Sequence, residues 1–216
     1  TGRISLFHVK RPPWLSVPTF IGPSSSLFSA DAKGNFGITS LTQRADGAIY
    51  AASRYGITVV NVVTSFPPGD ICSNNPETPI TVSPGSDSFT TPLVGAEIRG
   101  IQFLPEGNRA FVLQRTPPAL VGFDISTAPQ AYGNFPSDVL ETCSSPTFLQ
   151  AYDAGEGTRL YVTCFDAGQI YVFDPYVPRL IGVINAGRGP AGLAFPPSPG
   201  AHAVAYIVGF SANDMA

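Results

Sequence analysis

The sequence contains few charged residues and almost no lysine. Charged residues make up 12% of its 216 residues, and the formal net charge is -3. The lysines are Lys10 and Lys33, so no dense basic surface is available for nucleic acid or anionic lipid. No apolar run reaches the roughly eighteen residues that a membrane-spanning helix needs, and no secretory leader is visible. We therefore expect neither a nucleic-acid partner nor a transmembrane segment.

Complete catalytic and metal-binding motifs are also missing. The sequence has no G-x-S-x-G, H-E-x-x-H, C-x-x-C or phosphate-loop motif. His8 and His202 lie far apart and have no cysteine or acid at metal-ligand spacing. The stretch "DAGEGT" at 153–158 lacks the alternating ligands of a calcium loop and predicts a solvated hairpin turn. We expect no catalytic residue, no metal site and no bound cofactor.

One apparent nucleotide motif is better explained as a turn. Residues 187–192, "GRGPAG", satisfy G-x-G-x-x-G and follow a predicted strand. A dinucleotide site also needs a helix directly afterwards, but Pro190 lies inside the motif and "AFPPSPG" follows it. We interpret this stretch as a Gly- and Pro-containing connection between strands.

Short strands and turn residues dominate the rest of the chain. Glycine and proline occur 22 times each, and no segment has the pattern of a long helix. Residues 159–175, "RLYVTCFDAGQIYVFDP", contain two runs of aromatic and β-branched residues around Gly168, which is typical of a β-hairpin. In each run, apolar side chains occur on both faces of the strand, so we expect other sheets to cover both sides.

This hairpin is one copy of a repeated unit. Residues 109–125 repeat it, with Phe111 and Asp124 in the places of Tyr161 and Asp174. A weaker copy at 48–62 has Tyr50 and Asn61 at these places, and a partial copy at 203–216 has Tyr206. A further apolar run precedes each hairpin, and another follows each complete one. The unit therefore consists of four antiparallel strands, which predicts an all-β fold with the blades of a β-propeller.

Residues 159–197 resemble a known repeat. The segments "RLYVTC", "QIYVFD", "RLIGVINA" and "GRGPAGLAFPP" are similar to the successive parts of the YVTN-type propeller repeat, which occurs in bacterial surface and extracytoplasmic proteins. The match is fair at 99–125 and weak at 36–63, and insertions at 64–98 and 126–146 depart from the compact repeat. The resemblance implies a periplasmic, secreted or lipoprotein-type location.

The chain contains about four blade equivalents, and we treat 1–216 as one propeller domain or part of one. Residues 1–9 match a third blade strand, whereas 203–216 match a second strand. Two arrangements remain open: additional blades or another polypeptide complete a larger propeller, or residues 3–9 pair with 203–210 and close four blades. The second arrangement would remove exposed strand edges. We favour part of a larger propeller, because four-bladed rings are uncommon and the resembling family usually has more blades.

Two of the three cysteines are predicted to form a disulfide. Cys143 precedes an inner strand and Cys164 ends the next strand of the same blade, so both are expected on one rim. Closing this loop contributes about 3 kcal/mol in the chain-entropy treatment. Cys72 is left over and could pair with chain outside this sequence; three reduced thiols are the alternative.

Polar residues from several connections are expected on the same rim of the propeller. They come from the connections between blades and from the turns between middle strands, and the candidate binding residues are Arg54, Glu97, Arg99, Arg115, Asp166 and Arg188. Four arginines could hold a carboxylate or an acidic protein loop through paired hydrogen bonds. The alternative is that each arginine pairs with a neighbouring acid or carbonyl group and bridges blades.

These observations favour a non-catalytic, extracytoplasmic binding or scaffolding propeller that engages a protein partner. The low lysine content, the predicted disulfide and the proline-rich loops all indicate a location outside the cytoplasm. The alternative is a propeller enzyme or a cofactor-binding subunit, since lactonases, quinoprotein amine dehydrogenases and haem-containing nitrite reductases carry similar propellers. That alternative rests on analogy of fold alone.

Overall fold

The protein consists of short antiparallel sheets. The computed structural model describes residues 6–8, 19–22, 38–44, 49–53, 57–63, 81–84, 97–124, 136–196 and 204–210. Within these ranges every regular element is a β-strand, as the alternating apolar runs and the Gly and Pro turns predicted. The all-β fold class is therefore confirmed.

Three sheets contain four strands each, and in each sheet the strands follow one another in chain order. The first sheet contains β3 (Ile38–Gln43), β4 (Ile49–Ser53), β5 (Ile57–Val63) and β6 (Thr81–Pro84). The second contains β7 (Ile98–Phe103), β8 (Arg109–Arg115), β9 (Pro118–Asp124) and β10 (Pro136–Glu141). The third contains β11 (Pro146–Asp153), β12 (Thr158–Cys164), β13 (Gln169–Asp174) and β14 (Arg179–Asn185). The predicted hairpins at 48–62, 109–125 and 159–175 are the middle strands of these sheets.

Two further sheets have two strands each. They are formed by β1 (Leu6–His8) with β2 (Thr19–Gly22), and by β15 (Pro190–Ala194) with β16 (Tyr206–Gly209). In chain order, β1 and β2 come directly before β3, the first strand of the first complete sheet. The last two strands of each complete sheet come before the first strand of the next sheet in the same way. Among the described strands, β1 pairs with β2, β16 pairs with β15, and no described pairing joins these two sheets. Ile4 lies outside the described residues, and both arrangements of the chain ends stay predictions.

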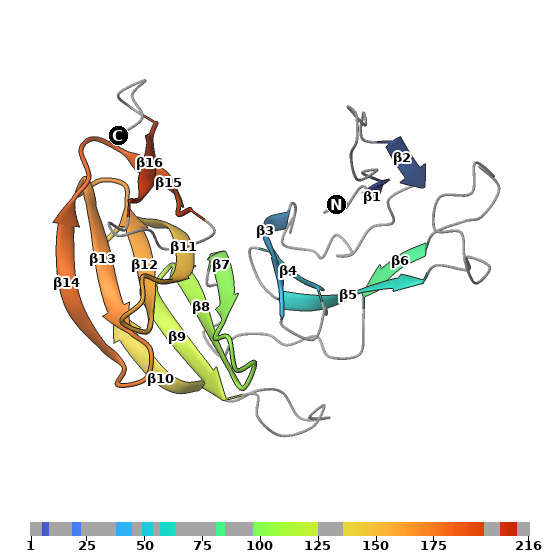
Figure 1. The fold of residues 1–216 in the computed structure, drawn as a ribbon, viewed down its shortest axis with the longest axis horizontal. Helices are drawn as coiled ribbons and strands as arrows, with labels where there is room; N and C mark the ends of the chain where they lie inside the picture. Colours follow the sequence, from blue (N-terminus) through green and yellow to red (C-terminus); the bar gives the residue numbers. More distant parts are fainter. Residues whose placement is uncertain are drawn as a thin grey trace.

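Successive sheets pack face to face (Figure 1). The first strands of neighbouring sheets lie against each other, β3 against β7, β7 against β11 and β11 against β15. This arrangement follows from the apolar residues on both faces of the middle strands, because each face needs a neighbouring sheet to exclude water. It is the stacking of blades in a β-propeller.

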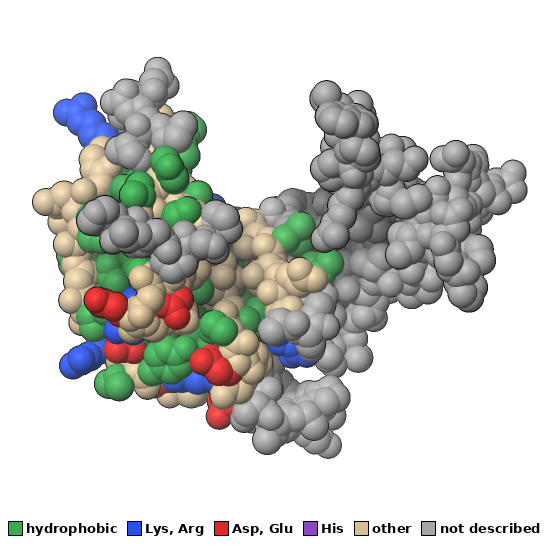
Figure 2. Space-filling view, viewed as in Figure 1, with side chains coloured by type: hydrophobic (Ala, Val, Ile, Leu, Met, Phe, Trp, Pro, Cys, Tyr) green, Lys and Arg blue, Asp and Glu red, His purple; other side chains and the backbone are tan. Residues whose placement is uncertain are grey.

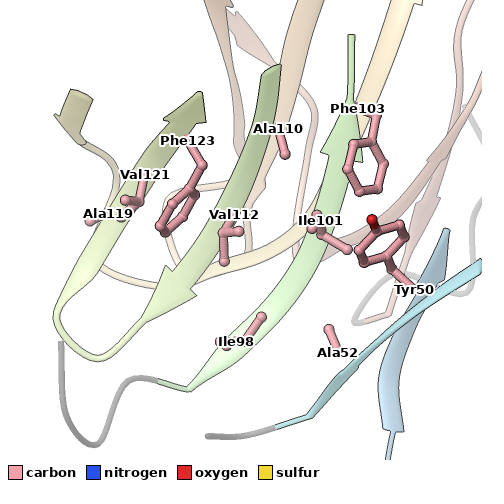
Figure 3. Packing of buried hydrophobic residues seen from close by; sticks show 10 residues of the cluster. All are labelled: Tyr50, Ala52, Ile98, Ile101, Phe103, Ala110, Val112, Ala119, Val121 and Phe123. Carbon is pink, nitrogen blue, oxygen red and sulfur yellow. The ribbon is translucent and has the colours of Figure 1, made fainter. Parts of the chain in front are cut away.

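The core between the first and second sheets contains the apolar side chains on one face of β7, β8 and β9 (Figure 3). Tyr50 and Ala52 of β4 point at this face, and the Tyr50 ring lies 4.6 Å from the Phe103 ring, measured between centroids. The cluster consists of Tyr50, Ala52, Ile98, Ile101, Phe103, Ala110, Val112, Ala119, Val121 and Phe123.

The opposite face of the second sheet packs on the third. Phe111 and Leu113 point away from their neighbours Ala110 and Val112 and join Leu149 and Leu160 in a second buried cluster. The alternation along β8 therefore serves two cores at once. Truncating Phe111 to alanine is expected to cost about 3–5 kcal/mol, since its ring is fully buried.

The predicted position of the repeated aromatic residues is confirmed, but their predicted burial is confirmed only in part. Tyr50, Phe111, Tyr161 and Tyr206 all lie on the second strand of their sheets. Tyr50 and Phe111 are buried, Tyr161 is half-buried, and Tyr206 is 52% exposed. The expectation that all four are mostly buried is wrong for Tyr206, because no sheet among the described residues covers that face of β16.

Candidate functional site

A repeated backbone hydrogen bond defines one end of the sheets. In three of the sheets, an N–H at the end of the second strand, in its last residue or the one after it, donates to the carbonyl oxygen of the residue before the first strand. The pairs are Arg115 with Glu97 at 2.8 Å, Phe165 with Ser145 at 3.0 Å, and Phe210 with Gly189 at 2.8 Å. We call this end the connection rim, because the chain passes from sheet to sheet there.

A disulfide anchors the connection rim. Cys143 and Cys164 are bonded, with their Cα atoms 5.9 Å apart and 21 residues between them in sequence. Cys143 lies in the connection from β10 to β11, and Cys164 ends β12. The bond therefore links the connection between the second and third sheets to a strand of the third sheet. The predicted pairing is confirmed. Cys72 lies outside the described residues.

A depression of about 680 Å³ opens beside the disulfide. The turn after β12 and the connection from β14 to β15 form its walls, and it is lined by Phe165, Asp166, Ala167, Gly168, Asn185, Gly187, Arg188 and Gly189. Two of the predicted binding residues, Asp166 and Arg188, are thus brought to one hollow although 22 positions separate them in sequence.

The two walls approach each other at Gly168. Its φ is +65°, its carbonyl oxygen accepts from the N–H of Ala186 at 2.8 Å, and a Cβ atom there would lie 2.5 Å from the Gly187 carbonyl oxygen. Only glycine satisfies both the backbone angle and this close approach. The floor of the depression is therefore fixed by backbone contacts.

Asp166 and Arg188 are both exposed, so their charges face solvent in the depression. The hollow presents a carboxylate, a guanidinium, the Asn185 amide and the Phe165 ring. These groups can accept hydrogen bonds from a ligand and donate hydrogen bonds to it, and the Phe165 ring can pack against an apolar group of that ligand. It has no group with the geometry of a nucleophile and its base.

Glu97 and Arg99 form an ion pair with each other, and each side chain is about one-quarter exposed. Their pairing matches the alternative that a rim arginine is held by a neighbouring acid. The Nε atom of Arg99 is buried without a hydrogen-bond partner. Arg115 is the last residue of β8 and is partly buried. Arg54 lies outside the described residues.

One polar residue of this rim was missed by sequence reasoning. Gln114 in β8 is fully buried, and neither atom of its amide has a hydrogen-bond partner. The repeat carries a signal that could have found it, because Gln114 occupies the position of Cys164 one sheet earlier, as the aligned aromatics Phe111 and Tyr161 show. A buried, unpaired amide is costly and therefore stands out among the core residues.

The turns that resemble ligand motifs are ordinary turns. Gly187 and Gly189 of "GRGPAG" have φ values of +80° and +61°, and β15 follows them instead of a helix. In "DAGEGT", Asp153 Oδ1 accepts from the N–H groups of Gly155 and Gly157 at 2.7 and 3.1 Å, so this carboxylate shapes its own turn.

No three His, Cys, Asp or Glu side chains among the described residues lie close enough to share a metal ion. No helix in the described part has the length and apolar character to cross a membrane.

Comparisons with known proteins identify the fold. No protein-family model matches the chain, and no curated protein matches it. A Bacteroides fragilis protein provisionally described as a 6-phosphogluconolactonase is 14% identical, with a TM-score of 0.70 over 99% of this chain. A periplasmic gluconolactonase of Pseudomonas aeruginosa is 14% identical, with a TM-score of 0.66 over 100%. The β-propeller domain of Myceliophteria thermophila Cps50 (Swd1) is 8% identical, with a TM-score of 0.55 over 98%.

At these identities the likeness shows the fold alone, and that fold is a β-propeller. The chain spans 59% of the length of the first and second of these structures and 60% of the third. The YVTN-type repeat itself has no family match, so that finer resemblance remains one of sequence pattern. The chain therefore has the fold of part of a β-propeller.

Proposed function

We propose that this chain is part of an extracytoplasmic binding propeller that engages a protein partner at the connection rim. The observation that carries the proposal is the depression between the β12–β13 turn and the β14–β15 connection, where Asp166 and Arg188 lie exposed. The disulfide beside it holds the neighbouring turn, and disulfides form in oxidising compartments. A loop with both a basic and an acidic side chain would match the two charges.

The rigidity of the site supports binding. Gly168, Ala186 and the disulfide fix the walls through backbone and covalent contacts, so little order is lost when a partner docks. Loops held on a rigid scaffold are the usual place for recognition. Among the described residues, the depression presents no nucleophile, base and oxyanion donors together, which favours binding over catalysis.

The test uses the double variant D166N/R188Q, which keeps the shape of the depression and removes both charges. Proteins of the extracytoplasmic fraction of the native source are bound to wild type, to the double variant and to E156Q, which removes an exposed acid from the β11–β12 turn. We expect one protein retained by wild type and E156Q and lost by the double variant. Equal retention by all three contradicts the proposal.

A lactonase-like enzyme is the second candidate. Two of the solved structures that share the fold are described as lactonases, and this alone favours it. The assay is hydrolysis of glucono-δ-lactone, corrected for spontaneous opening, by wild type and D166N/R188Q. Turnover by wild type that the double variant loses would support the enzyme over the binding protein. We expect no turnover above the buffer rate.

A further inference from the structure

The face of β16 that carries Tyr206 is apolar and exposed. Its exposed residues alternate along the chain and are Val204, Tyr206, Val208 and Phe210, with exposed fractions between 49% and 75%. Residues two apart in extended chain share a face, so these four side chains form one surface. Successive sheets pack in chain order, and no further sheet follows β16 among the described residues. Exposed apolar surfaces of this kind mark interfaces with other protein.

Two of the interfaces between sheets contain the same pair of aromatic rings. Tyr50 of β4 meets Phe103 of β7, with ring centroids 4.6 Å apart and ring planes inclined by 50° (Figure 3). Tyr161 of β12 meets Phe195, which directly follows β15, at 4.7 Å and 52°. In both interfaces, a tyrosine on the second strand of one sheet contacts a phenylalanine at the end of the first strand of the next sheet. Tilted rings at this distance attract each other beyond the effect of burial alone.

The strand register shows that the two pairs are equivalent and that Tyr206 takes the same place. Tyr50, Tyr161 and Tyr206 each lie opposite the fifth residue of the first strand of their own sheet. Phe103 and Phe195 each lie five residues after the residue that begins a first strand, and they end the similar sequences "GIQF" and "GLAF". Tyr206 is 52% exposed, and no aromatic ring of the described residues is paired with it.

The interface between the second and third sheets shows that the two positions match in size. Its second strand carries Phe111 in the place of the tyrosines, and the third sheet carries Ala151 in the place of Phe103. Phe111 is fully buried, and Ala151 packs against its cluster. In this chain, each tyrosine with a described partner is matched by a phenylalanine, whereas the phenylalanine is matched by a small residue. Tyr206 is therefore expected to meet an aromatic residue.

We propose that a further four-stranded sheet of the same propeller covers the Tyr206 face, and that its first strand ends in an aromatic residue that packs on the Tyr206 ring. The same polypeptide carries this sheet, because each described sheet packs on the one next to it in chain order. The length of the similar propellers agrees, since the chain spans 59% to 60% of them. This interface between sheets is independent of the partner proposed for the connection rim.

The first sheet of this chain is the competing occupant. If the described sheets closed into a ring, β3 would lie against β15, and the residue five positions after Ile38 would meet Tyr206. That residue is Gln43, which stands in the place of Phe103 and Phe195. An amide side chain has no ring to pair with the tyrosine. Closure by β3 would therefore leave Tyr206 without the aromatic partner that Tyr50 and Tyr161 have.

The test places the photoreactive residue p-benzoylphenylalanine at position 206 of the native polypeptide, produced in its native source. Irradiation joins this side chain to a group in contact with it, and mass spectrometry of the digested product identifies the joined peptide. We expect a peptide of the same polypeptide, outside residues 1–216, with Phe, Tyr or Trp at or beside the joined residue. On a denaturing gel the product should keep the mass of one polypeptide.

Two further variants complete the test. Val139→p-benzoylphenylalanine is the matched control, because Val139 is 62% exposed on the outer strand β10 and should not join that peptide. Val208→p-benzoylphenylalanine lies on the same face as Tyr206 and should join the same peptide. It replaces the first variant if the far-ultraviolet circular dichroism of that variant is altered.

Four results would overturn the proposal. Joining to residues 41–43 of β3 would show that the first sheet covers β16. A product heavier than one polypeptide would place a second copy or a different protein on this face. A joined peptide without an aromatic residue would contradict the ring pair. Absence of any joined product from positions 206 and 208 in folded protein would show that no sheet covers the face.

Discussion

The guanidinium group of Arg109 in β8 donates a hydrogen bond to the carbonyl oxygen of Pro175, 66 positions later in the chain, at 2.8 Å. The same group pairs with Asp138 of β10 and lies over the Phe111 ring, 5.2 Å from its centroid. Arg109 therefore joins two strands of the second sheet to the β13–β14 turn of the third. Charged side chains gather along this edge of the molecule, opposite the connection rim (Figure 2).

Replacing Arg109 with methionine is expected to lower the free energy of unfolding by about 2–4 kcal/mol. The change removes the bond to Pro175 and leaves Asp138, a partly buried carboxylate, without its arginine. Urea denaturation measures the loss. R159M is the control, because the nitrogen–oxygen distance from Arg159 to Asp174 is 3.9 Å and that pair is looser. An equal loss in both variants would contradict a special role for Arg109.

Gly168→Ala is expected to destabilise the protein by about 2–3 kcal/mol, since it combines a positive φ with a backbone contact at 2.5 Å. Gly107→Ala is the matched control, because Gly107 has a φ of +72° and open space around its missing Cβ. That variant should lose about 1 kcal/mol from the backbone angle alone. Thermal or urea unfolding gives both values. If the two losses are equal, the close approach at Gly187 contributes nothing.

Gln114→Met is expected to raise the free energy of unfolding by about 1–2 kcal/mol. Methionine has a similar length, and the change removes a fully buried amide without hydrogen-bond partners. Gln102→Met is the control, because the Gln102 amide donates to the Leu149 carbonyl oxygen at 3.3 Å and its removal should be destabilising. Urea denaturation measures both variants. Lower stability in Gln114→Met would show that the amide is satisfied.

Acid should weaken the turn between β13 and β14. Burial raises the pKa of Asp174, but the N–H groups of Val177 and Tyr176 and the nearby guanidinium groups of Arg159 and Arg179 outweigh it, and the net pKa lies below the ordinary value. A lowered pKa means that the ionised form stabilises the fold above the unfolded-state pKa of about 4, and that this contribution is lost as pH falls through the folded-state pKa.

The measurement for Asp174 compares urea unfolding of wild type and D174N between pH 6 and pH 3. Wild type should be more stable at pH 6, and the difference should shrink as the pH falls below about 4. E156Q is the control, because Glu156 is exposed and the variant should follow wild type at every pH. A difference between wild type and D174N that does not change with pH would contradict the charge effect.

The disulfide is expected to contribute about 3 kcal/mol to stability, the chain-entropy value for closing a loop of this size. C143S/C164S should therefore unfold at lower urea concentration than wild type. Peptide mapping without reductant should recover the peptides of Cys143 and Cys164 joined. Free thiols at both positions in native material would contradict the bond.

Much of the fold follows from local sequence pattern. The hairpins around Gly168 and at 109–125 could be predicted because strand residues and turn residues alternate there at short range. The repeat then supplied the four-strand unit and placed Cys143 and Cys164 on one rim, which the structure confirms. The place of the repeated aromatics on second strands followed in the same way, since equivalent residues in a repeat take equivalent positions.

Other features depend on contacts between distant segments. Local pattern was enough to predict the repeated strands, their order and a Cys143–Cys164 disulfide, because period-two patterning and turn chemistry act over a few residues. Only the tertiary structure decided that Asp166 and Arg188 share a hollow, that Glu97 neutralises Arg99, and that Tyr206 is exposed while Phe111 is buried. Those outcomes depend on which sheet lies against which face, and burial and pairing energies exist only once the sheets have packed.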